Sequence, residues 1–247
     1  MENDFNVKKN RPMICNISGV YEKMYPVETK VNMTDISGTN CYCDEEAARM
    51  IRECIFSTDE PILSDIRLLD SGNFHYLSYF FMEKIREPFA LIIIDNHTDM
   101  QQPGFGRILS CGGWVRYAME ELGNLKQVCL VGMSEEHLSE AMPLPDDVSY
   151  IKSGSLAEIS CEFPIYLSID KDVLAVEYAA TDWDQGQMGV DELVDIVTQI
   201  LHHHRVLGVD ICGEKKDGAT EAQLTKNRAV NDRLLEAIFS LQEGGVV

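Results

Sequence analysis

Acidic and histidine side chains recur directly after apolar stretches of strand length in this sequence. The stretch LIII is followed by Asp95, His97 and Asp99, and the stretch IYLSI is followed by Asp170 and Asp172. In an extended segment alternate residues project from one side, so the members of each group can converge. Carboxylates packed together cannot all stay ionised without a counter-charge, which a divalent cation supplies. These two groups therefore predict a metal site.

The number of donors favours two ions over one. Four carboxylates and one imidazole, some of them bridging, exceed what a single ion needs, and His75 follows another strand-like segment and a Ser-Gly-Asn turn. Oxygen-rich ligation with some imidazole suits Mn²⁺ better than Fe²⁺, Co²⁺ or Zn²⁺. A hydroxide bridging two such ions would be the nucleophile, because the metals lower the pKa of bound water. The alternative for each group alone is a solvated turn, or for His75 a capping or packing role.

Two further apolar stretches end in acids. Asp70 follows IRLL, and Asp210 follows LGV, with Glu214 a few residues later. Ligands of parallel α/β sheets bind beyond the carboxyl ends of the strands. We therefore expect all four strand ends to meet at one rim.

Apolar stretches alternate with segments of helical periodicity along the chain. This alternation predicts βαβ units, an α/β fold with a mostly parallel sheet covered on both faces, and one domain over 1–247 with the polar residues 1–11 loose. The expected strands are 12–21, 66–70, 89–95, 127–133, 148–153, 164–173 and 206–212. The expected helices are one that Asp44 caps, and 75–85, 110–122, 134–142, 190–204 and 220–241.

Composition excludes several functional classes. The 247 residues carry a formal net charge of −20, which repels phosphate backbones and argues against nucleic-acid binding. This charge agrees with a cationic substrate, although solubility alone also explains it. No apolar run approaches the length of a membrane span, and no segment resembles a signal peptide. A cytoplasmic protein is the expectation.

The eight cysteines do not require a disulfide framework in a chain of this length. Cys129 and Cys212 stand in apolar runs, where buried free thiols are normal. Cys41 and Cys43 are too close for the usual zinc spacing. For Cys111 a packing role is favoured over a nucleophilic one. The histidines 202–204 point in different directions on a helix, so they indicate a helix end and not a chelate.

Three segments together resemble the arginase/agmatinase family of ureohydrolases. They are SGNFHYLS (71–78), DNHTD (95–99) and SIDKD (168–172), in the family's order and at similar separations. The resemblance implies an arginase-like three-layer α/β/α fold with a centre of two Mn²⁺ ions. It implies one ion held by His75, Asp95, Asp99 and Asp170, and the other by His97, Asp95, Asp170 and Asp172.

The chain also departs from that family pattern. The first segment lacks the family's Gly-Gly-Asp, and no Asp-Pro follows the third segment. The loop 100–117 has no counterpart of the histidine that relays protons in many arginases. Gly213 stands where the family has a guanidinium-binding glutamate, and Glu214 comes one residue later. The metal ligands thus match the pattern better than the substrate pocket does.

The sequence is also similar to an arginase-like branch with SCGGW and TDWDQG segments, some members of which convert peptide arginine to ornithine. Within TDWDQG, Asp182, Trp183 and Asp184 could bind a guanidinium by ion pairing and cation–π contact. A surface turn is the alternative for these three residues. The resemblance therefore allows either a small cationic molecule or an arginine-containing peptide as substrate, and it allows a homo-oligomer.

The expected function is metal-dependent hydrolysis of a C–N bond in a guanidinium-type substrate, as in ureohydrolases of linear amidines. Asp99 would accept a proton from the attacking hydroxide and pass it toward the leaving amine. Glu214, with Asp182 or Asp184, would hold the cation. Two alternatives are a metal-dependent amide hydrolase or deacetylase, and a degenerate family member without catalysis.

Overall fold

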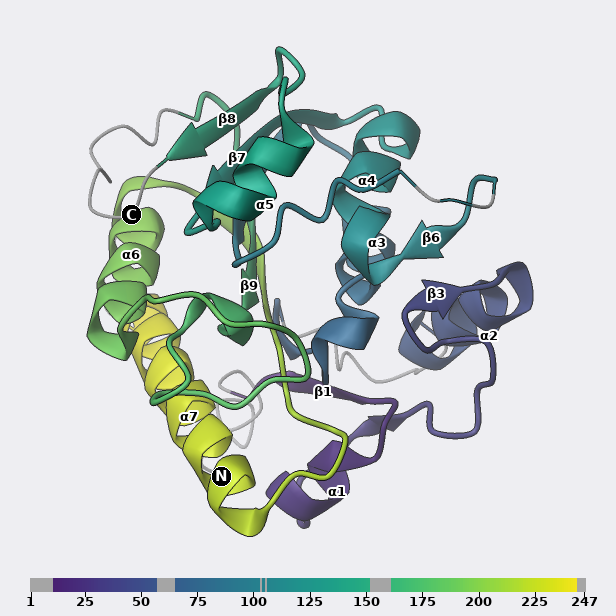
Figure 1. Cartoon of the computed structure of the whole chain (residues 1–247), viewed down its shortest axis with the longest axis vertical. Coiled ribbons are helices and arrows are strands. Elements are labelled where there is room, and N and C mark those ends of the chain that lie inside the picture. The colour runs from purple at the N-terminus through teal and green to yellow at the C-terminus, as the bar shows by residue number, and fades with distance from the viewer. Residues whose placement is uncertain (1–10, 57–64, 103, 105, 152–160, 244–247) are drawn as a thin grey trace, which may run out of the picture.

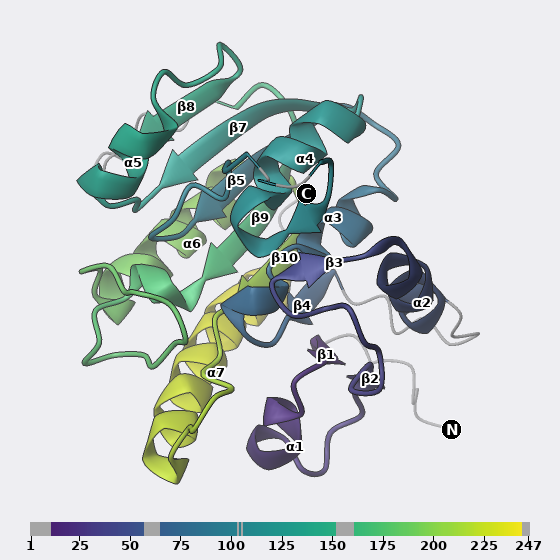
Figure 2. The ribbon, with the colours of Figure 1, turned by 45° about the vertical axis from the view of Figure 1, so that its right-hand side comes forward.

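A parallel eight-stranded sheet forms the centre of the computed structural model, which describes residues 11–56, 65–102, 104, 106–151 and 161–243. The strand order is β2-β1-β4-β10-β9-β5-β7-β8, and every pairing within this sheet is parallel. Figure 2 shows these strands from β8 at the top to β2 at the bottom. The expected parallel sheet is confirmed. Residues 1–11 were predicted to be loose. Residues 1–10 lie outside the described residues, so this prediction is not tested.

The central strands come from the apolar runs of the sequence. All six residues of β5 and all six of β9 are buried, as expected of strands covered on both faces. The strands of this sheet are β1 (Met13–Asn16), β2 (Val31–Asn32), β4 (Ile66–Leu68), β5 (Phe89–Ile94), β7 (Leu125–Val131), β8 (Val148–Ile151), β9 (Ile165–Asp170) and β10 (Val206–Cys212).

Helices cover both faces of the sheet, which gives three layers (Figure 1). On one face pack α1 (Val20–Met24), α6 (Val190–His203) and α7 (Glu221–Glu243). On the other pack α2 (Glu45–Phe56), α3 (Leu77–Met82) and α4 (Trp114–Glu121), while α5 (Glu135–Ala141) has no buried residue. The predicted three-layer α/β/α architecture is therefore confirmed.

Local signals in the sequence explain where the helices begin and end. In α6 the buried side chains recur at helical spacing, so one stripe faces the sheet. The Asp44 carboxylate accepts a hydrogen bond from the Ala47 amide at 2.8 Å and caps α2 as predicted. His202 and His203 occupy the last turn of α6, in agreement with the helix-end interpretation.

Three very short strands were not predicted. They are β2, β3 (Tyr42–Cys43) and β6 (Leu109–Ser110), and the last two form a separate antiparallel pair. Two residues are too few for a periodic pattern, so only the pairing partner defines such strands. The predicted strand 12–21 divides into β1 and the short helix α1.

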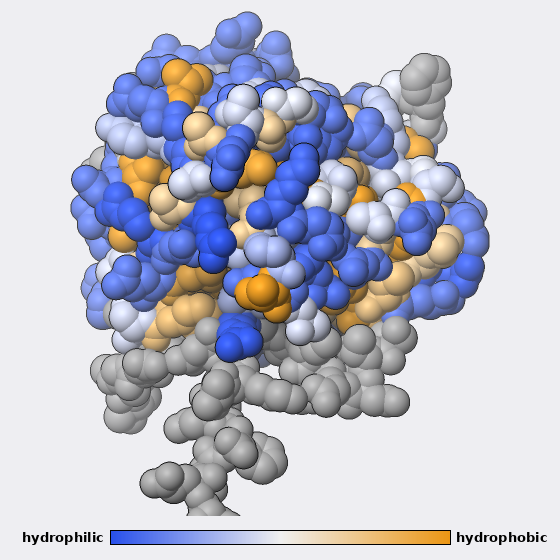
Figure 3. Space-filling model, turned by 90° about the horizontal axis from the view of Figure 1, so that it is seen from below, coloured by the Kyte–Doolittle hydropathy of each residue, from blue (hydrophilic) through white to orange (hydrophobic). Residues whose placement is uncertain are grey.

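Hydrophilic residues predominate on the face drawn in Figure 3, with hydrophobic ones scattered among them. Within the described residues no helix is both long and apolar enough to cross a bilayer. The organisation of residues 1–247 as a single domain stays a prediction, because both ends lie outside the described residues.

Candidate metal centre

Three strands of the sheet deliver the predicted ligands to one place. β9 lies between β10 and β5, and β10 pairs with β4. Asp95 directly follows β5, Asp170 ends β9, and Asp172 lies in the 3₁₀ turn Lys171–Val173. His75 follows the 3₁₀ turn Gly72–Phe74 that comes after β4. Parallel pairing therefore places these side chains at the carboxyl ends of neighbouring strands.

The first group of contacts surrounds His75. Its Nδ1 atom lies 3.0 Å from Asp99 Oδ2, 3.3 Å from Asp95 Oδ2 and 3.6 Å from Asp170 Oδ2. All four residues are buried. Asp99 reaches this position with a positive φ of 50°, which places its backbone in the left-handed region.

The second group surrounds His97. Its Nδ1 atom lies 3.0 Å from Asp172 Oδ2 and 3.4 Å from Asp95 Oδ1. Asp95 thus turns one oxygen toward each imidazole. The ligand atoms of His75, Asp95 and Asp99 lie within 4.8 Å of one another, and so do those of Asp95, His97 and Asp172. The structure brings all six predicted metal ligands into one cluster that shares Asp95.

Burial and the charge of Asp95 raise the pKa of neighbouring carboxylates in the cluster. Burial, and then the charge of Asp95, raises the pKa of Asp170 from 3.8 to about 6. Burial and the charges of Asp170 and Asp95 raise the pKa of Asp172 well above its ordinary value. Burial also works to raise the pKa of Asp95, but hydrogen bonds from His75 and His97 outweigh it and lower that pKa. Without a metal, the negative charge of these carboxylates is offset by bound protons and by the imidazoles. A divalent cation would supply the same counter-charge.

The donor set fits divalent cations in a second respect. A metal-binding histidine uses one ring nitrogen, while the other is fixed by a hydrogen-bond partner. His75 Nε2 lies 2.8 Å from Ser168 Oγ, and His97 Nε2 lies 3.0 Å from Asp184 Oδ1. Both Nδ1 atoms are thereby aimed at the carboxylates. The residues present would hold two ions that share Asp95.

Trp114 supports the cluster, a role that the sequence pattern did not predict. Its indole Nε1–H donates to Asp99 Oδ2 at 2.6 Å, and its ring packs 4.9 Å from the His75 ring. Gly113 precedes it because a Cβ atom there would lie 2.8 Å from the Gln101 carbonyl oxygen. The SCGGW segment thus brings an indole against a ligand. A buried tryptophan usually donates its indole N–H to an acceptor. This tendency was the one feature of the sequence that could have indicated the role of Trp114.

Comparisons with known proteins agree with this geometry. A sequence model of the arginase family matches residues 75–214, a range that contains all six cluster residues. This chain belongs to the arginase family. An uncharacterised protein of Thermotoga maritima is 33% identical over 174 residues, which are 70% of this chain and 68% of that protein.

Solved structures share the fold of this arginase-family chain. Agmatine ureohydrolase of Thermoplasma volcanium superposes with a TM-score of 0.68 at 13% identity, covering 98% of this chain and 94% of that one. Formimidoylglutamase from Bacillus subtilis superposes with a TM-score of 0.64 at 15% identity, covering 92% of this chain and 86% of that one.

Glu214, predicted to bind substrate, lies fully buried and turned away from the cluster. One of its carboxylate oxygens is ion-paired with the Lys171 ammonium, and Asn231 Nδ2 donates to the same oxygen at 2.7 Å. Asn227 Nδ2 donates to the other oxygen at 2.8 Å, and the Tyr21 hydroxyl lies 3.4 Å from the first. These contacts occupy both oxygens, so they favour a positioning role over direct contact with a substrate.

The two aspartates of the TDWDQG loop also contact other residues of this chain. Asp182 accepts hydrogen bonds from Ser71 Oγ at 3.0 Å and from the Lys216 amide at 2.9 Å, so it joins two loops. Asp184 contacts His97 at the edge of the cluster. Trp183 lies between them, is 40% exposed, and packs against Gly72 and, 5.9 Å away, the His97 ring.

Of the two further acids predicted at the rim of strand ends, Asp70 follows the end of β4 as expected, whereas Asp210 does not lie at a strand end, which corrects that part of the expectation. Asp210 lies inside β10, where its carboxylate accepts from Arg67 at 3.2 Å and from the Tyr166 hydroxyl. Asp70 accepts hydrogen bonds from the Ile17 and Ser18 amides, both at 2.9 Å, and ties the first loop to the sheet. The sequence did not show that β10 continues beyond Asp210 to Cys212.

The contacts of the described cysteines agree with packing roles. All eight cysteines are free, and Cys129 and Cys212 are buried as predicted. Burial, and then the charge of Asp99, raises the pKa of the Cys111 thiol. A raised pKa disfavours the thiolate, in agreement with a packing role for Cys111.

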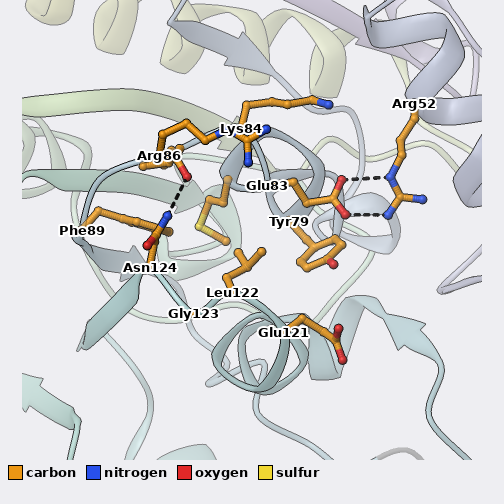
Figure 4. Close-up of a pocket in the computed structure, with 12 residues that line it drawn as sticks. Arg52, Tyr79, Glu83, Lys84, Arg86, Phe89, Glu121, Leu122, Gly123 and Asn124 are labelled. Atoms are coloured by element: carbon orange, nitrogen blue, oxygen red, sulfur yellow. Dashed lines mark hydrogen bonds and ion pairs between the residues drawn. The ribbon is translucent and has the colours of Figure 1, made fainter.

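A separate surface cavity of about 440 Å³ lies at the other end of the sheet (Figure 4). Phe89, the first residue of β5, lines it, whereas the cluster follows the last residue of that strand. Arg52 and Glu83 close one wall through two hydrogen bonds of 2.9 and 2.6 Å. None of the predicted site residues lines this cavity.

Proposed function

We propose that this arginase-family chain is a hydrolase that uses two divalent ions, Mn²⁺ by preference, to cleave a C–N bond in a guanidinium or amidine group. The observation that supports this most is the buried cluster of four aspartates and two histidines that shares Asp95. Its described contacts include two imidazoles and no lysine or arginine. Oxygen-rich ligation with some imidazole suits Mn²⁺.

The bound ions would lower the pKa of water and stabilise the charge that develops at the guanidinium carbon. The chain's own groups have distinct roles around them. Asp99 takes the proton of the attacking water and passes it toward the leaving amine. Trp114 holds the Asp99 carboxylate through its indole N–H, and Ser168 holds the His75 ring.

The substrate is a cation at the open edge of the cluster. His97 is the most exposed of the six ligands, with 15% of its side chain accessible, so the cluster opens beside it. The half-exposed indole of Trp183 lies next to that opening and offers a ring face to a guanidinium. The net charge of −20 favours the approach of such a cation. Of the carboxylates predicted to hold it, Asp184 is the one nearest the opening.

The deciding experiment combines metal analysis with an activity screen. Protein purified with added Mn²⁺ is assayed for bound metal, and then for urea, formamide and ammonia from arginine, agmatine, guanidinobutyrate, formiminoglutamate and arginine-containing peptides. We expect two metal equivalents and release of urea from at least one guanidine, or of formamide from formiminoglutamate. Comparison of the activity on free arginine with the activity on arginine-containing peptides shows which class of arginine compound is used.

His97→Ala is the test variant, and His202→Ala is its control because His202 lies exposed at the end of α6. His97→Ala should lose activity and one metal equivalent, whereas His202→Ala should lose neither. Acetate release from an acyl-lysine substrate, with no urea from any guanidine, would identify an amide hydrolase instead. Failure of the wild-type chain to bind Mn²⁺ would favour a family member without catalysis.

A further inference from the structure

The His97 ring has a second contact that the predicted ligand set does not use. Its Nδ1 faces Asp95 and Asp172, while its Nε2 lies 3.0 Å from Asp184 Oδ1. Asp184 comes from the loop before α6, far along the chain from the DNHTD segment. A carboxylate on the outer nitrogen of a metal-binding imidazole fixes the ring's tautomer and orientation and raises its basicity.

Asp184 is itself held from two sides. Asn96 Nδ2 donates to Asp184 Oδ2 at 3.1 Å and to the Asp184 carbonyl oxygen at 3.2 Å. His137 Nε2 lies 3.0 Å from the same Oδ2. These two contacts are made to Asp184 Oδ2, while Asp184 Oδ1 faces His97.

The helix that carries His137 is tied to the same loop. The Ser134 hydroxyl caps α5 by accepting from the His137 amide at 3.2 Å, and the Ser134 amide donates to the Asn96 carbonyl at 3.2 Å. The His97 and His137 rings lie 4.4 Å apart with an interplanar angle of 38°. Two segments distant in the sequence therefore converge on the carboxylate of a third.

We propose that Asp184 and His137 are positioning residues for the metal centre: Asp184 accepts the Nε2–H of His97 and keeps Nδ1 aimed at the ion, and His137 holds Asp184. This inference rests on the proposed metal-dependent function and deepens it. It gives Asp184 a role other than substrate binding, and it gives His137 a role that the sequence did not suggest.

Mn²⁺ titration of the full-length chain, with thermal unfolding of the metal-free protein, tests this inference. Asp184→Ala should weaken one of the two metal equivalents about 10- to 100-fold, the usual loss when the partner of a ligating histidine is removed. The other equivalent and the metal-free melting temperature should stay unchanged, because 65% of the Asp184 side chain is exposed. His137→Gln should weaken the same equivalent by a smaller factor, and Asp184→Glu should restore most of the wild-type affinity.

Matched controls are Asp191→Ala and His202→Gln, since both residues lie exposed on α6. Neither control should change metal binding. If Asp184→Ala keeps both affinities and only raises KM, Asp184 contacts the substrate and the inference is wrong. A third equivalent in the wild type that His137→Gln removes would also overturn it, because His97, His137 and Asp184 would then be an additional metal site. Wild-type protein that binds no Mn²⁺ would instead refute the proposed function and this inference together.

Discussion

Two buried polar clusters lie back to back at the end of β9, and they differ in charge balance. Lys171 stands between Asp170 and Asp172 in the sequence, but its side chain points the other way, toward α7. There the Lys171 ammonium pairs with Glu214, and Asn227 and Asn231 donate to the remaining lone pairs. The metal-centre cluster on the other side gathers four carboxylates around two imidazoles.

This difference in charge balance distinguishes a cluster with a structural role from one suited to binding cations. In the Lys171 cluster one fixed positive charge meets one negative charge, so the described contacts are complete without a ligand. The Arg67–Asp210 pair with Tyr166 is balanced in the same way. The four aspartates of the metal centre reach such balance only by taking up protons or metal ions. An excess of buried acids therefore marks the centre more clearly than burial or polarity alone.

Removal of the shared carboxylate should break the metal centre most completely. We expect Asp95→Ala to lose both metal equivalents and all hydrolytic activity, because Asp95 faces both imidazoles. Asp172→Asn should lose activity and only one equivalent, because Asp172 contacts His97 and not His75. Metal quantification by elemental analysis checks both variants, and two retained equivalents in Asp95→Ala would contradict the assignment.

Removal of the Lys171 ammonium should destabilise the fold through the Lys171 cluster. Lys171→Met leaves the Glu214 charge buried and unpaired, which should destabilise the fold by about 3–5 kcal/mol in urea unfolding. The double variant Lys171→Met/Glu214→Leu should regain much of this stability, because neither charge remains. If that double variant folds and binds two ions yet has lost all turnover, Glu214 contacts the substrate as the sequence predicted.

Loss of the Trp114 hydrogen bond should weaken the metal centre without dismantling it. Trp114→Phe keeps an aromatic ring against His75 but removes the donor to Asp99 Oδ2. Metal affinity should fall about 10- to 100-fold, as for other groups that hold a ligand in place. Mn²⁺ titration measures this, and unchanged affinity would show that Asp99 needs no support from the indole.

The metal-centre cluster should also respond to pH. The pKa of Asp170 is raised to about 6, so protons compete with metal ions below that pH and Mn²⁺ affinity should fall roughly tenfold per proton and pH unit. The metal-free chain should show the opposite trend in stability. Between the ordinary pKa of 3.8 and about 6 the folded state holds more protons than the unfolded state, so stability falls as pH rises. Unfolding measured with and without Mn²⁺ checks both slopes, and parallel slopes would contradict proton–metal competition.

The amino-acid sequence by itself determined the central strands and the segments that carry the metal ligands. Continuous apolar runs predicted β5 and β9, and the alternation of Asp95, His97 and Asp99 predicted that these side chains would meet. The first inference depends only on the apolar runs. The second assumed an extended segment, whereas β5 ends at Ile94, residues 95–97 form a bend and Asp99 has a φ of 50°, so the folded backbone path also determines how these side chains meet. The caps of α2 and α5 depend on local hydrogen bonds, and the sequence indicated those helix starts.

Only the tertiary structure decided what surrounds the ligands. The contact of Trp114 with Asp99, and that of Asp184 with His97 and His137, join residues that share no periodic pattern. The direction of Glu214 was decided in the same way. Gly213 adopts a φ of +91°, and a Cβ atom there would lie 2.2 Å from Asp170 Oδ1, so the chain passes close behind the ligand and turns Glu214 toward Lys171. Such contacts follow from strand order and loop path, which depend on the packing of the whole sheet and leave no mark in any one segment.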